Sequence, residues 1–286
     1  MRFNRQRTHP DFDTRLGYEY PSHLRSAIQD LPSTPGVYIF HGAEGELPLY
    51  IGKSINIRNR VLSHLRTEDE ARMLRQTQRI SCIQTVGEIG ALLLEAQLIK
   101  QQHPLFNQKL RRTRQMCSLT LREHRPEVVY SKDVNFATQT GLFGLYASKR
   151  SAIEALRTLA DEQRLCLSVL GLEKTTKQSP CFRAMLKRCA GACCGEESLR
   201  AHHARLLAAL EEQRLVCWPY PGAIGLVERN ANEMQVHVIH HWFYLGSASD
   251  LEQAKRLNTV APDFDSDGYK ILCKPLLSGD VEVVSL

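Results

Sequence analysis

The sequence predicts a mixed α/β (α+β) domain, then a helical cysteine-rich region, then a small β-rich C-terminal domain. Short β-branched runs alternate with amphipathic runs between residues 30 and 110. Five cysteines crowd between positions 166 and 194, among helical patterns. After Pro219 and Pro221 the chain returns to strand-like runs. A chain of 286 residues is long enough for two or three such units.

The first domain is expected to have the order ββαβα. Gly36 opens a strand, and Ile57, Val61 and Leu65 recur every four residues, which is typical of an amphipathic helix. A second helix is expected to end near Pro104, because proline cannot continue it. The expected strands and helices cover residues 36–40, 49–51, 57–65, 80–86 and 91–102.

The rest of the chain is expected to alternate in type. Strand-like pieces occur at 116–121 and 127–130, and Ser151 with Glu154 fits a capping box that opens a helix. Further on, a helix is expected over 197–215, strands over 223–228 and 234–245, and a turn at 263–268. These patterns predict an N-terminal extension, the α/β domain, a linking β segment, the helical region and the β-rich domain, over residues 1–29, 30–110, 111–150, 151–215 and 216–286.

Charge and hydropathy favour a cytoplasmic protein with a polyanionic partner. The chain has 37 Lys plus Arg residues and 31 Asp plus Glu residues, which gives a net charge of +6 and a pI near 8.8. Apolar runs fall far short of the roughly 20 residues of a membrane span, and no secretory signal is recognisable. Basic residues gather in three segments beside the motifs below, at 58–66, 109–114 and 187–188, which favours contacts with phosphates. The expected DNA-binding residues are Arg58, Lys109, Arg111, Arg112 and Arg114.

The most specific pattern lies between residues 36 and 107. Gly36-Val37-Tyr38 is followed after eleven residues by Tyr50-Ile51-Gly52-Lys53. Arg60 comes ten residues after Tyr50, Glu95 lies in the second expected helix, and Asn107 follows twelve residues later. In this order the motifs resemble the GIY-YIG nuclease domain of the UvrC family of excision nucleases. The resemblance extends over about residues 30–215.

The resemblance implies hydrolysis of a phosphodiester, with Tyr50 as general base and Tyr38 orienting the attacking water. Glu95 would bind one Mg²⁺ or Mn²⁺, hard cations that prefer oxygen ligands. A phenol with a pKa near 10 is about one part in a thousand ionised at pH 7, so the site must lower that pKa or place the water well. Lys53 and Arg60 are suitable cations for this, Arg60 also for bridging phosphate oxygens, and Asn107 would hold the base of the site together.

One position departs from the family pattern. Four residues after the arginine that family usually has another tyrosine, whereas this chain has His64. Imidazole exchanges protons nearer neutrality, so His64 is either a compensating catalytic group or an ordinary histidine on the helix surface.

The cysteines form a second pattern, which resembles the cysteine-rich stretch after the UvrC nuclease domain. Four thiolates can hold zinc tetrahedrally or anchor a [4Fe–4S] cluster. The uneven spacing and the resemblance favour an iron–sulfur cluster over zinc. The remaining alternative is that the cysteines bind no metal. The expected ligands are Cys166, Cys181, Cys189 and Cys193, and Cys194 is an alternative to Cys193.

The resemblance implies a DNA-repair endonuclease that makes the 3′-side incision in double-stranded damaged DNA, acting with UvrB after UvrA has loaded it. Residues 216–286 show neither the acidic triad nor the helix-hairpin-helix pair of the second UvrC nuclease domain, so one incision is expected. Two alternatives remain open: an autonomous GIY-YIG endonuclease, and a non-catalytic DNA-binding protein with a metal cluster. The first would cut undamaged DNA without partners, and the second would bind DNA without cutting it.

Overall fold

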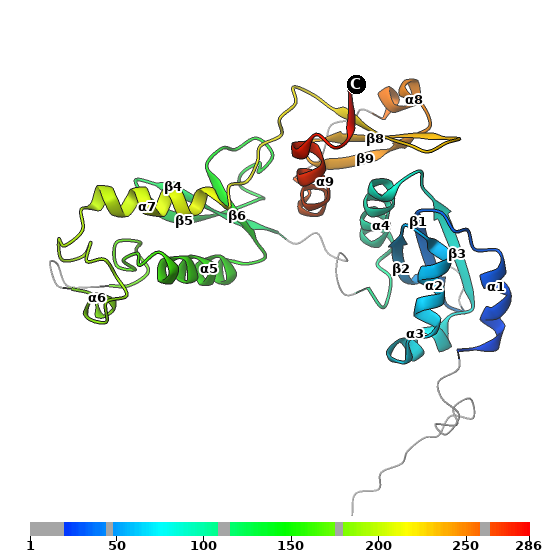
Figure 1. Ribbon diagram of the computed structural model, residues 1–286, viewed down its shortest axis with the longest axis horizontal. Coiled ribbons are helices and arrows are strands. Elements are labelled where there is room, and N and C mark those ends of the chain that lie inside the picture. Colours follow the sequence, from blue (N-terminus) through cyan, green and yellow to red (C-terminus); the bar gives the residue numbers. More distant parts are fainter. Residues whose placement is uncertain (1–19, 44–47, 108–114, 175–179, 258–263) are drawn as a thin grey trace, which may run out of the picture.

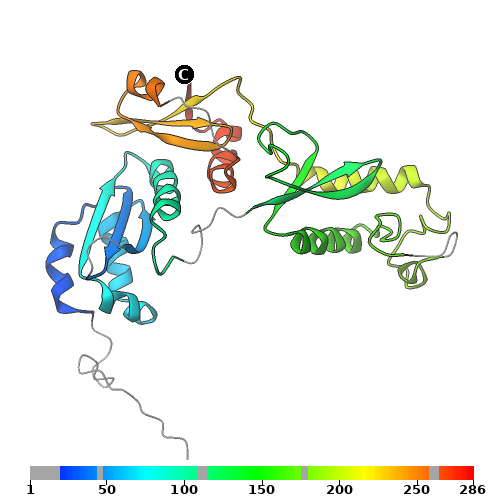
Figure 2. The same cartoon turned by 180° about the vertical axis from the view of Figure 1, so that it is seen from behind.

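The computed structural model describes residues 20–43, 48–107, 115–174, 180–257 and 264–286. They form three antiparallel sheets with helices packed against them. Two views from opposite sides show the first and third sheets together in one lobe, while the second sheet extends away with helices α5 and α7 (Figures 1 and 2). Across these described ranges, none of the helices has the length and hydropathy needed to cross a membrane.

The first sheet has the strand order β2-β1-β3. The five elements predicted in the order ββαβα are all present, together with two short helices that the sequence did not predict. Its strands are β1 (Gly36–His41), β2 (Pro48–Ser54) and β3 (Arg79–Gln84). The helices are α1 (Arg25–Gln29), α2 (Ile57–Leu65), α3 (Ala71–Gln76) and α4 (Glu88–Gln102), with 3₁₀ turns η1 (Ser22–Leu24) and η2 (Glu68–Glu70).

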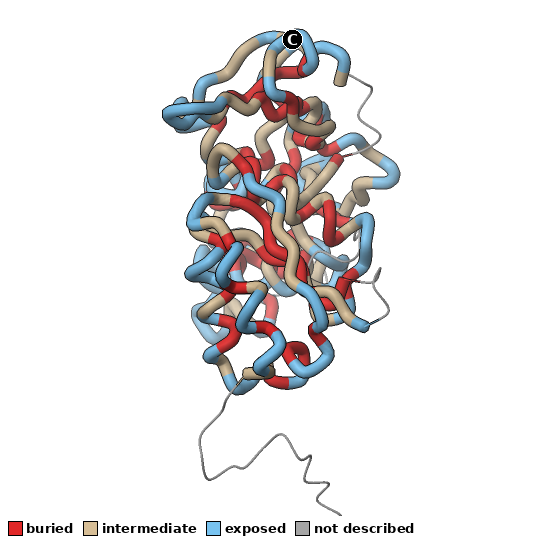
Figure 3. Tube along the Cα trace, turned by 90° about the vertical axis from the view of Figure 1, so that its right-hand side faces the viewer, coloured by how far each residue is buried: buried red, intermediate tan, exposed pale blue. Residues whose placement is uncertain are grey.

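The two faces of this sheet have separate cores. Because side chains alternate along a strand, Tyr38 and Phe40 of β1 pack with α1, α2 and α3, whereas Val37 and Ile39 pack with Ile99 of α4. Seen from the side of this lobe, buried residues follow the strands and inner helix faces, and exposed residues mark the outer turns (Figure 3). The sheet is therefore covered on both faces.

The second sheet has the order β5-β4-β6 and shares one core with two long helices. Its elements are β4 (Cys117–Arg122), β5 (Arg125–Tyr130), β6 (Leu142–Tyr146), α5 (Lys149–Glu162), α6 (Phe182–Met185) and α7 (Leu199–Glu211). The prediction that Ser151 opens α5 was wrong by one turn. Ser148 is the N-cap, and its hydroxyl accepts from the Ser151 backbone N–H while the Ser151 hydroxyl bonds back, so two serines form the capping box.

The third sheet, β10-β7-β8-β9, contains more elements than the sequence predicted. The expected strand over 234–245 is two strands, joined where His241 and Trp242 take left-handed backbone angles that no glycine signals. Position 263 of the expected turn at 263–268 lies outside the described residues. Residues 266–268 are not a turn but the start of a helix, because the Asp265 side chain caps it. The elements are β7 (Ile224–Arg229), β8 (Met234–His240), β9 (Phe243–Ala248), α8 (Leu251–Arg256), α9 (Ser266–Ser278) and β10 (Glu282–Ser285).

Candidate active site and cysteine centre

The two motif strands place their tyrosines on one face of the first sheet. Tyr38 of β1 lies opposite Gly52 of β2, and the ring centroids of Tyr38 and Tyr50 are 6.2 Å apart. A Cβ atom at Gly52 would lie 2.2 Å from the Tyr38 hydroxyl and 2.9 Å from the Tyr50 ring. The glycine between the tyrosines is therefore needed for their close packing.

The buried Tyr38 hydroxyl is the centre of a polar network. Tyr38 is 1% exposed and His64 of α2 is 3% exposed, and the Tyr38 oxygen lies 2.6 Å from His64 Nε2. The other ring nitrogen, Nδ1, bonds the carboxylate of Glu70. A donated Nδ1–H to Glu70 leaves Nε2 as the acceptor of the Tyr38 proton. Arg60 also hydrogen-bonds Tyr38, which raises the pKa of Arg60.

Burial controls the proton affinities in this network. Burial, and then the neighbouring Tyr50, raise the pKa of Tyr38 well above its ordinary value. Burial also lowers the pKa of His64, against the opposing pull of Glu70. His64 is thus a buried, neutral imidazole and not a histidine on the helix surface.

The pKa of Tyr50 is raised rather than lowered by its protein surroundings. Burial is the largest cause and the negative charge of Glu95 is the second, while a hydrogen bond with Tyr38 and the charge of Arg60 act in the opposite direction. The Lys53 ammonium lies 2.6 Å from Glu88 Oε1 at the start of α4, so this carboxylate partly balances its charge. Tyr50 therefore keeps its hydroxyl proton, and it can accept a proton from water only if its own proton moves to a neighbouring group.

Glu95 projects from α4 toward the end of β2. Its Oε1 accepts the backbone N–H of Lys53 at 3.1 Å, and burial raises the pKa of its half-buried carboxyl. Within the described residues, no ion pair neutralises this carboxylate and no hydrogen bond occupies Oε2. A partly dehydrated carboxylate with a free oxygen fits a divalent cation. The other ligands of such a cation would be water and a DNA phosphate.

The Asn107 side chain binds the backbone of strand β2 at Ile51, next to Tyr50. Its Oδ1 accepts the Ile51 N–H at 2.9 Å and its Nδ2 donates to the Ile51 carbonyl at 2.8 Å. Both bonds are buried, so the side chain replaces a missing strand neighbour at the sheet edge. Arg58, like Arg60, is exposed on α2. The remaining predicted DNA contacts lie outside the described residues: Lys109, Arg111, Arg112 and Arg114.

Sequence reasoning missed Glu70, the partner of His64. It lies in the turn η2, where three successive acidic residues (68–70) give no reason to prefer it. The missing signal is the buried histidine, which is visible only once α2 is placed on the sheet.

The cysteine centre is assembled from four separate positions of the middle region. The sulfur atoms of Cys166, Cys181, Cys189 and Cys193 all lie within 4.8 Å of one another. Cys194 is outside this group, and its thiol donates to the Gly191 carbonyl.

Backbone N–H groups point at two of the sulfurs, as expected for thiolates. The Cys181 N–H lies 3.3 Å from the Cys193 sulfur, and the Gly191 N–H lies 3.3 Å from the Cys189 sulfur. Burial raises the pKa of Cys166 and Cys181, whereas hydrogen bonds from Cys181 lower that of Cys193 against its own burial. Four crowded thiols of this kind fit a metal centre.

Three family models match successive parts of the chain. A UvrC-like GIY-YIG domain matches residues 34–108, a UvrC/Cho excinuclease middle domain matches 99–212, and an excinuclease Cho C-terminal domain matches 223–286. The first two overlap at residues 99–108. The three models together span the nuclease site, the cysteine centre and the third sheet.

Curated relatives extend over almost the whole chain. Excinuclease Cho of Escherichia coli (strain K12) is 58% identical over 276 residues, which covers 96% of this chain and 94% of that protein. Excinuclease Cho of Salmonella typhimurium is 56% identical with the same coverage. The UvrABC system protein C of Desulforudis audaxviator is 31% identical over 64% of this chain and 31% of its own length.

Among solved structures, the N-terminal GIY-YIG endonuclease domain of UvrC from Thermotoga maritima, bound to magnesium, is 36% identical to the chain. The match covers 30% of this chain and 98% of that domain, at a TM-score of 0.28. A score this low does not establish a shared fold, so the family assignment depends on the sequence relatives. Their identity and coverage show that the chain belongs to the excinuclease Cho family and is a DNA endonuclease with a UvrC-like GIY-YIG domain.

Proposed function

We propose that the protein makes a single incision on the 3′ side of a lesion in double-stranded DNA, after UvrA and UvrB have loaded on the damage. The observation that carries the proposal is the convergence of Tyr50, Arg60 and Glu95, whose charges act on one another's pKa values. The relatives that match almost the whole chain are named excinuclease Cho. Among the described residues there is one such site, which suits one incision.

In this proposal Glu95 holds one Mg²⁺ or Mn²⁺, with water and a phosphate oxygen as its other ligands. The cation would stabilise the negative charge that develops on the phosphate. Arg60 contributes a second positive charge, and its planar guanidinium suits two phosphate oxygens. Lys53 holds α4 to β2 through Glu88 and also lowers the pKa of Glu95, opposing burial. Arg58, Lys109, Arg111, Arg112 and Arg114 would contact the DNA backbone.

Tyr50 acts as the general base by passing its proton along the buried network. When the water proton moves to the Tyr50 oxygen, the phenol proton of Tyr50 moves to the Tyr38 oxygen. The Tyr38 proton moves in turn to His64 Nε2, 2.6 Å away. Glu70 stabilises the resulting imidazolium through Nδ1. This route gives a tyrosine with a raised pKa a partner that accepts protons nearer neutrality.

The four cysteines hold a structural or DNA-sensing centre in this proposal, away from the hydrolysis. The sequence spacing favours a [4Fe–4S] cluster. The close approach of the sulfurs favours zinc, because four Zn–S bonds of about 2.3 Å put sulfurs less than about 4 Å apart. Absorbance near 400 nm together with bound iron would support a [4Fe–4S] cluster. A colourless protein with one bound zinc ion would show that the centre is a zinc site instead.

The experiment that tests the function is incision of an end-labelled duplex carrying one bulky adduct, with Mg²⁺. Wild type, Arg60→Ala and the matched variant Arg150→Ala are compared, with and without UvrA and UvrB. Arg150 is exposed on α5 and pairs with Glu154, so its loss leaves the nuclease site intact. We expect one 3′-side cut that needs the partners and is lost in Arg60→Ala alone.

The two alternatives give different products in the same assay. Cutting of undamaged DNA without partners would replace the proposal with an autonomous endonuclease. DNA binding without any cutting would replace it with a non-catalytic binding protein.

A further inference from the structure

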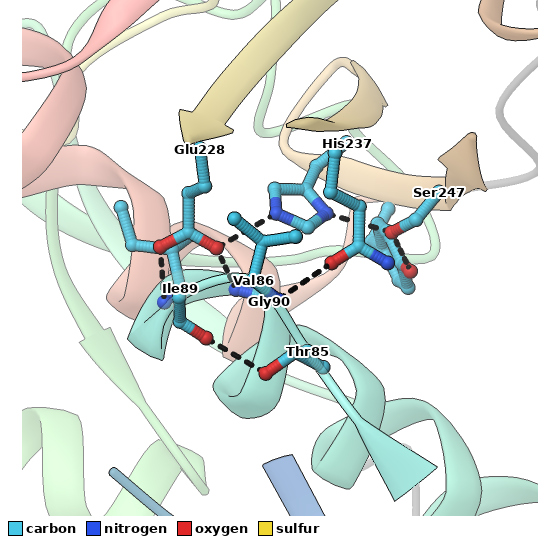
Figure 4. Close-up of polar contacts among 10 residues, drawn as sticks. Thr85, Val86, Ile89, Gly90, Glu228, His237 and Ser247 are labelled. Atoms are coloured by element: carbon cyan, nitrogen blue, oxygen red, sulfur yellow. Dashed lines mark hydrogen bonds and ion pairs between the residues drawn. The ribbon is translucent and has the colours of Figure 1, made fainter. Parts of the chain in front are cut away.

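The N-terminus of α4 is capped by a residue from the third sheet. Gly87 is the N-cap and offers no side chain to the free backbone N–H groups of the first turn. The Glu228 carboxylate of β7 takes that role, accepting from Ile89 N–H at 2.9 Å and Gly90 N–H at 2.8 Å. Figure 4 shows the two oxygens directed at these amides. The predicted start of this helix at residue 91 was therefore too late by one turn.

A buried polar chain holds Glu228 in place (Figure 4). His237, which is fully buried, has Nε2 2.8 Å from Glu228 Oε2 and Nδ1 2.6 Å from the Ser247 hydroxyl. Tyr244 bonds the same hydroxyl at 2.6 Å. Burial alone would raise the pKa of Glu228, but the bonds from His237, Gly90 and Ile89 lower it below the ordinary range. The cap is therefore an anion at neutral pH, which suits a helix N-terminus.

Two glycines leave room for this cap. A Cβ at Gly87 would lie 2.2 Å from Glu228 Oε1, and one at Gly90 would lie 2.6 Å from His237 Cε1. A larger residue at either position would therefore displace the Glu228 or His237 side chain. The spacing of these glycines is explained by the third sheet, not by the helix that contains them.

The third sheet and its helix hold α4 at a second point. Lys100 Nζ lies 2.5 Å from Asp265 Oδ1 and 3.0 Å from Asp267 Oδ2, at the N-terminus of α9. All three side chains are less than one-fifth exposed, so water screens these pairs little. Between the two points Leu93 packs in one core with Trp242 and other residues of the third domain.

Glu95 lies midway between the two attachment points but on the opposite side of the helix. Gly90 and Lys100 are each five residues away, about 7.5 Å along the helix axis. Leu98 and Ile99, neighbours of Glu95 on its face, pack against the first sheet. Any slide or rotation of α4 would move the Glu95 carboxylate relative to Tyr50.

We propose that Glu228, His237, Lys100 and Asp265 form an α4 clamp, through which the C-terminal domain sets the position of Glu95 and hence the affinity for the divalent cation. This inference rests on the proposed function of Glu95 as the metal ligand. The four residues are positioning residues, since none of them touches the reacting groups.

The test measures Mn²⁺ binding to the full-length protein, by the electron paramagnetic resonance signal of free Mn²⁺. Glu228→Gln keeps the shape of the side chain but loses its charge, and one of its two acceptor oxygens becomes a donor. Glu282→Gln is the matched control, because Glu282 belongs to the same sheet but pairs with exposed Arg229. We expect about 10-fold weaker binding in Glu228→Gln, the size seen when residues that orient metal ligands are changed, and no change in Glu282→Gln.

A Glu95→Gln sample separates the clamp from the proposed metal site. Loss of binding in Glu95→Gln with unchanged affinity in Glu228→Gln would overturn the clamp alone. Unchanged binding in Glu95→Gln would overturn the proposed metal site itself.

Lys100→Met tests the second attachment point if Glu228→Gln does not fold. Its control is Lys255→Met, which removes an exposed pair with Glu252 on α8. Weaker Mn²⁺ binding in Lys100→Met, with cleavage restored at high Mg²⁺, would support positioning. Full Mn²⁺ affinity with a lowered melting temperature would overturn it, because the contact would then be purely structural.

Discussion

The two faces of helix α4 contact different parts of the chain. The face toward the first sheet carries Glu95, whose surroundings come from residues 36–107. The opposite face meets Glu228, 138 positions beyond Gly90 in the sequence, and Asp265, 165 beyond Lys100. One face bears the proposed chemistry and the other fixes its position. A motif can therefore identify a reaction while the residues that align its catalytic groups lie in another domain.

The strongest contrast between the two faces is expected from substitutions on α4 itself. Glu95→Gln removes the proposed carboxylate ligand, and we expect cleavage at saturating Mg²⁺ to fall by about 100- to 1000-fold. Gln102→Ala, at an exposed position of the same helix, should change the rate by no more than about threefold. Single-turnover rates measure both, and equal losses would contradict a special role for Glu95.

The second contrast concerns the buried histidine. His64→Phe removes the proton acceptor of Tyr38, and we expect about 10- to 100-fold slower cleavage at pH 7. Because burial lowers the pKa of His64, wild-type activity should stay level as the pH falls to about 6.5 and decline only below it. His64→Tyr should move that decline to higher pH. If His64→Tyr and wild type had the same pH–rate profile, His64 would not take part in proton transfer.

A third contrast separates alignment from chemistry within the first sheet. Asn107→Ala leaves the N–H and carbonyl of Ile51 without their buried partners, and we expect a loss of about 2–4 kcal/mol in unfolding free energy. Asn59→Ala, at an exposed position of α2, should lie within about 0.5 kcal/mol of wild type. Denaturant titration measures both variants. A small effect at Asn107 would mean that water readily replaces its amide.

The smallest expected effect tests the space beside the cap. Alanine normally favours a helix over glycine by about 1 kcal/mol. At Gly90 the added Cβ would meet His237 and Glu228, so we expect Gly90→Ala to destabilise by about 1–3 kcal/mol instead. Gly222→Ala, with nothing within 4 Å of the new atom, is the control. If Gly90→Ala were more stable than wild type, His237 and Glu228 would not be packed as closely against Gly90 as the structure shows.

The sequence predicted the parts of the fold that depend on local patterns. Local patterns located the three strands of the first sheet and the helices α2 and α4, though not the short helices α1 and α3. The cysteine spacing located four sulfurs that the structure brings together. The resemblance to the UvrC family placed Tyr50, Arg60 and Glu95 in one site, and the structure brings them close enough to affect one another's pKa values.

The features that sequence reasoning missed depend on distant contacts. The start of α4 was misplaced because its cap lies in the third sheet, and no local residue signals it. The sequence at 263–268 is typical of a turn, yet Asp265 caps a helix and pairs with Lys100. Glu70 was missed because its role depends on a histidine whose burial no local pattern predicts.

The most direct test of the account is single-turnover cleavage by Tyr50→Phe of an adduct-bearing duplex, with UvrA, UvrB and Mg²⁺. Tyr50→Phe removes one oxygen and keeps the ring, and Tyr130→Phe, on β5, is the matched control. The account predicts at least about 100-fold slower incision in Tyr50→Phe, with DNA binding and the rate of Tyr130→Phe unchanged. Incision by Tyr50→Phe at the wild-type rate would contradict it, because another group would then have to take the proton from water.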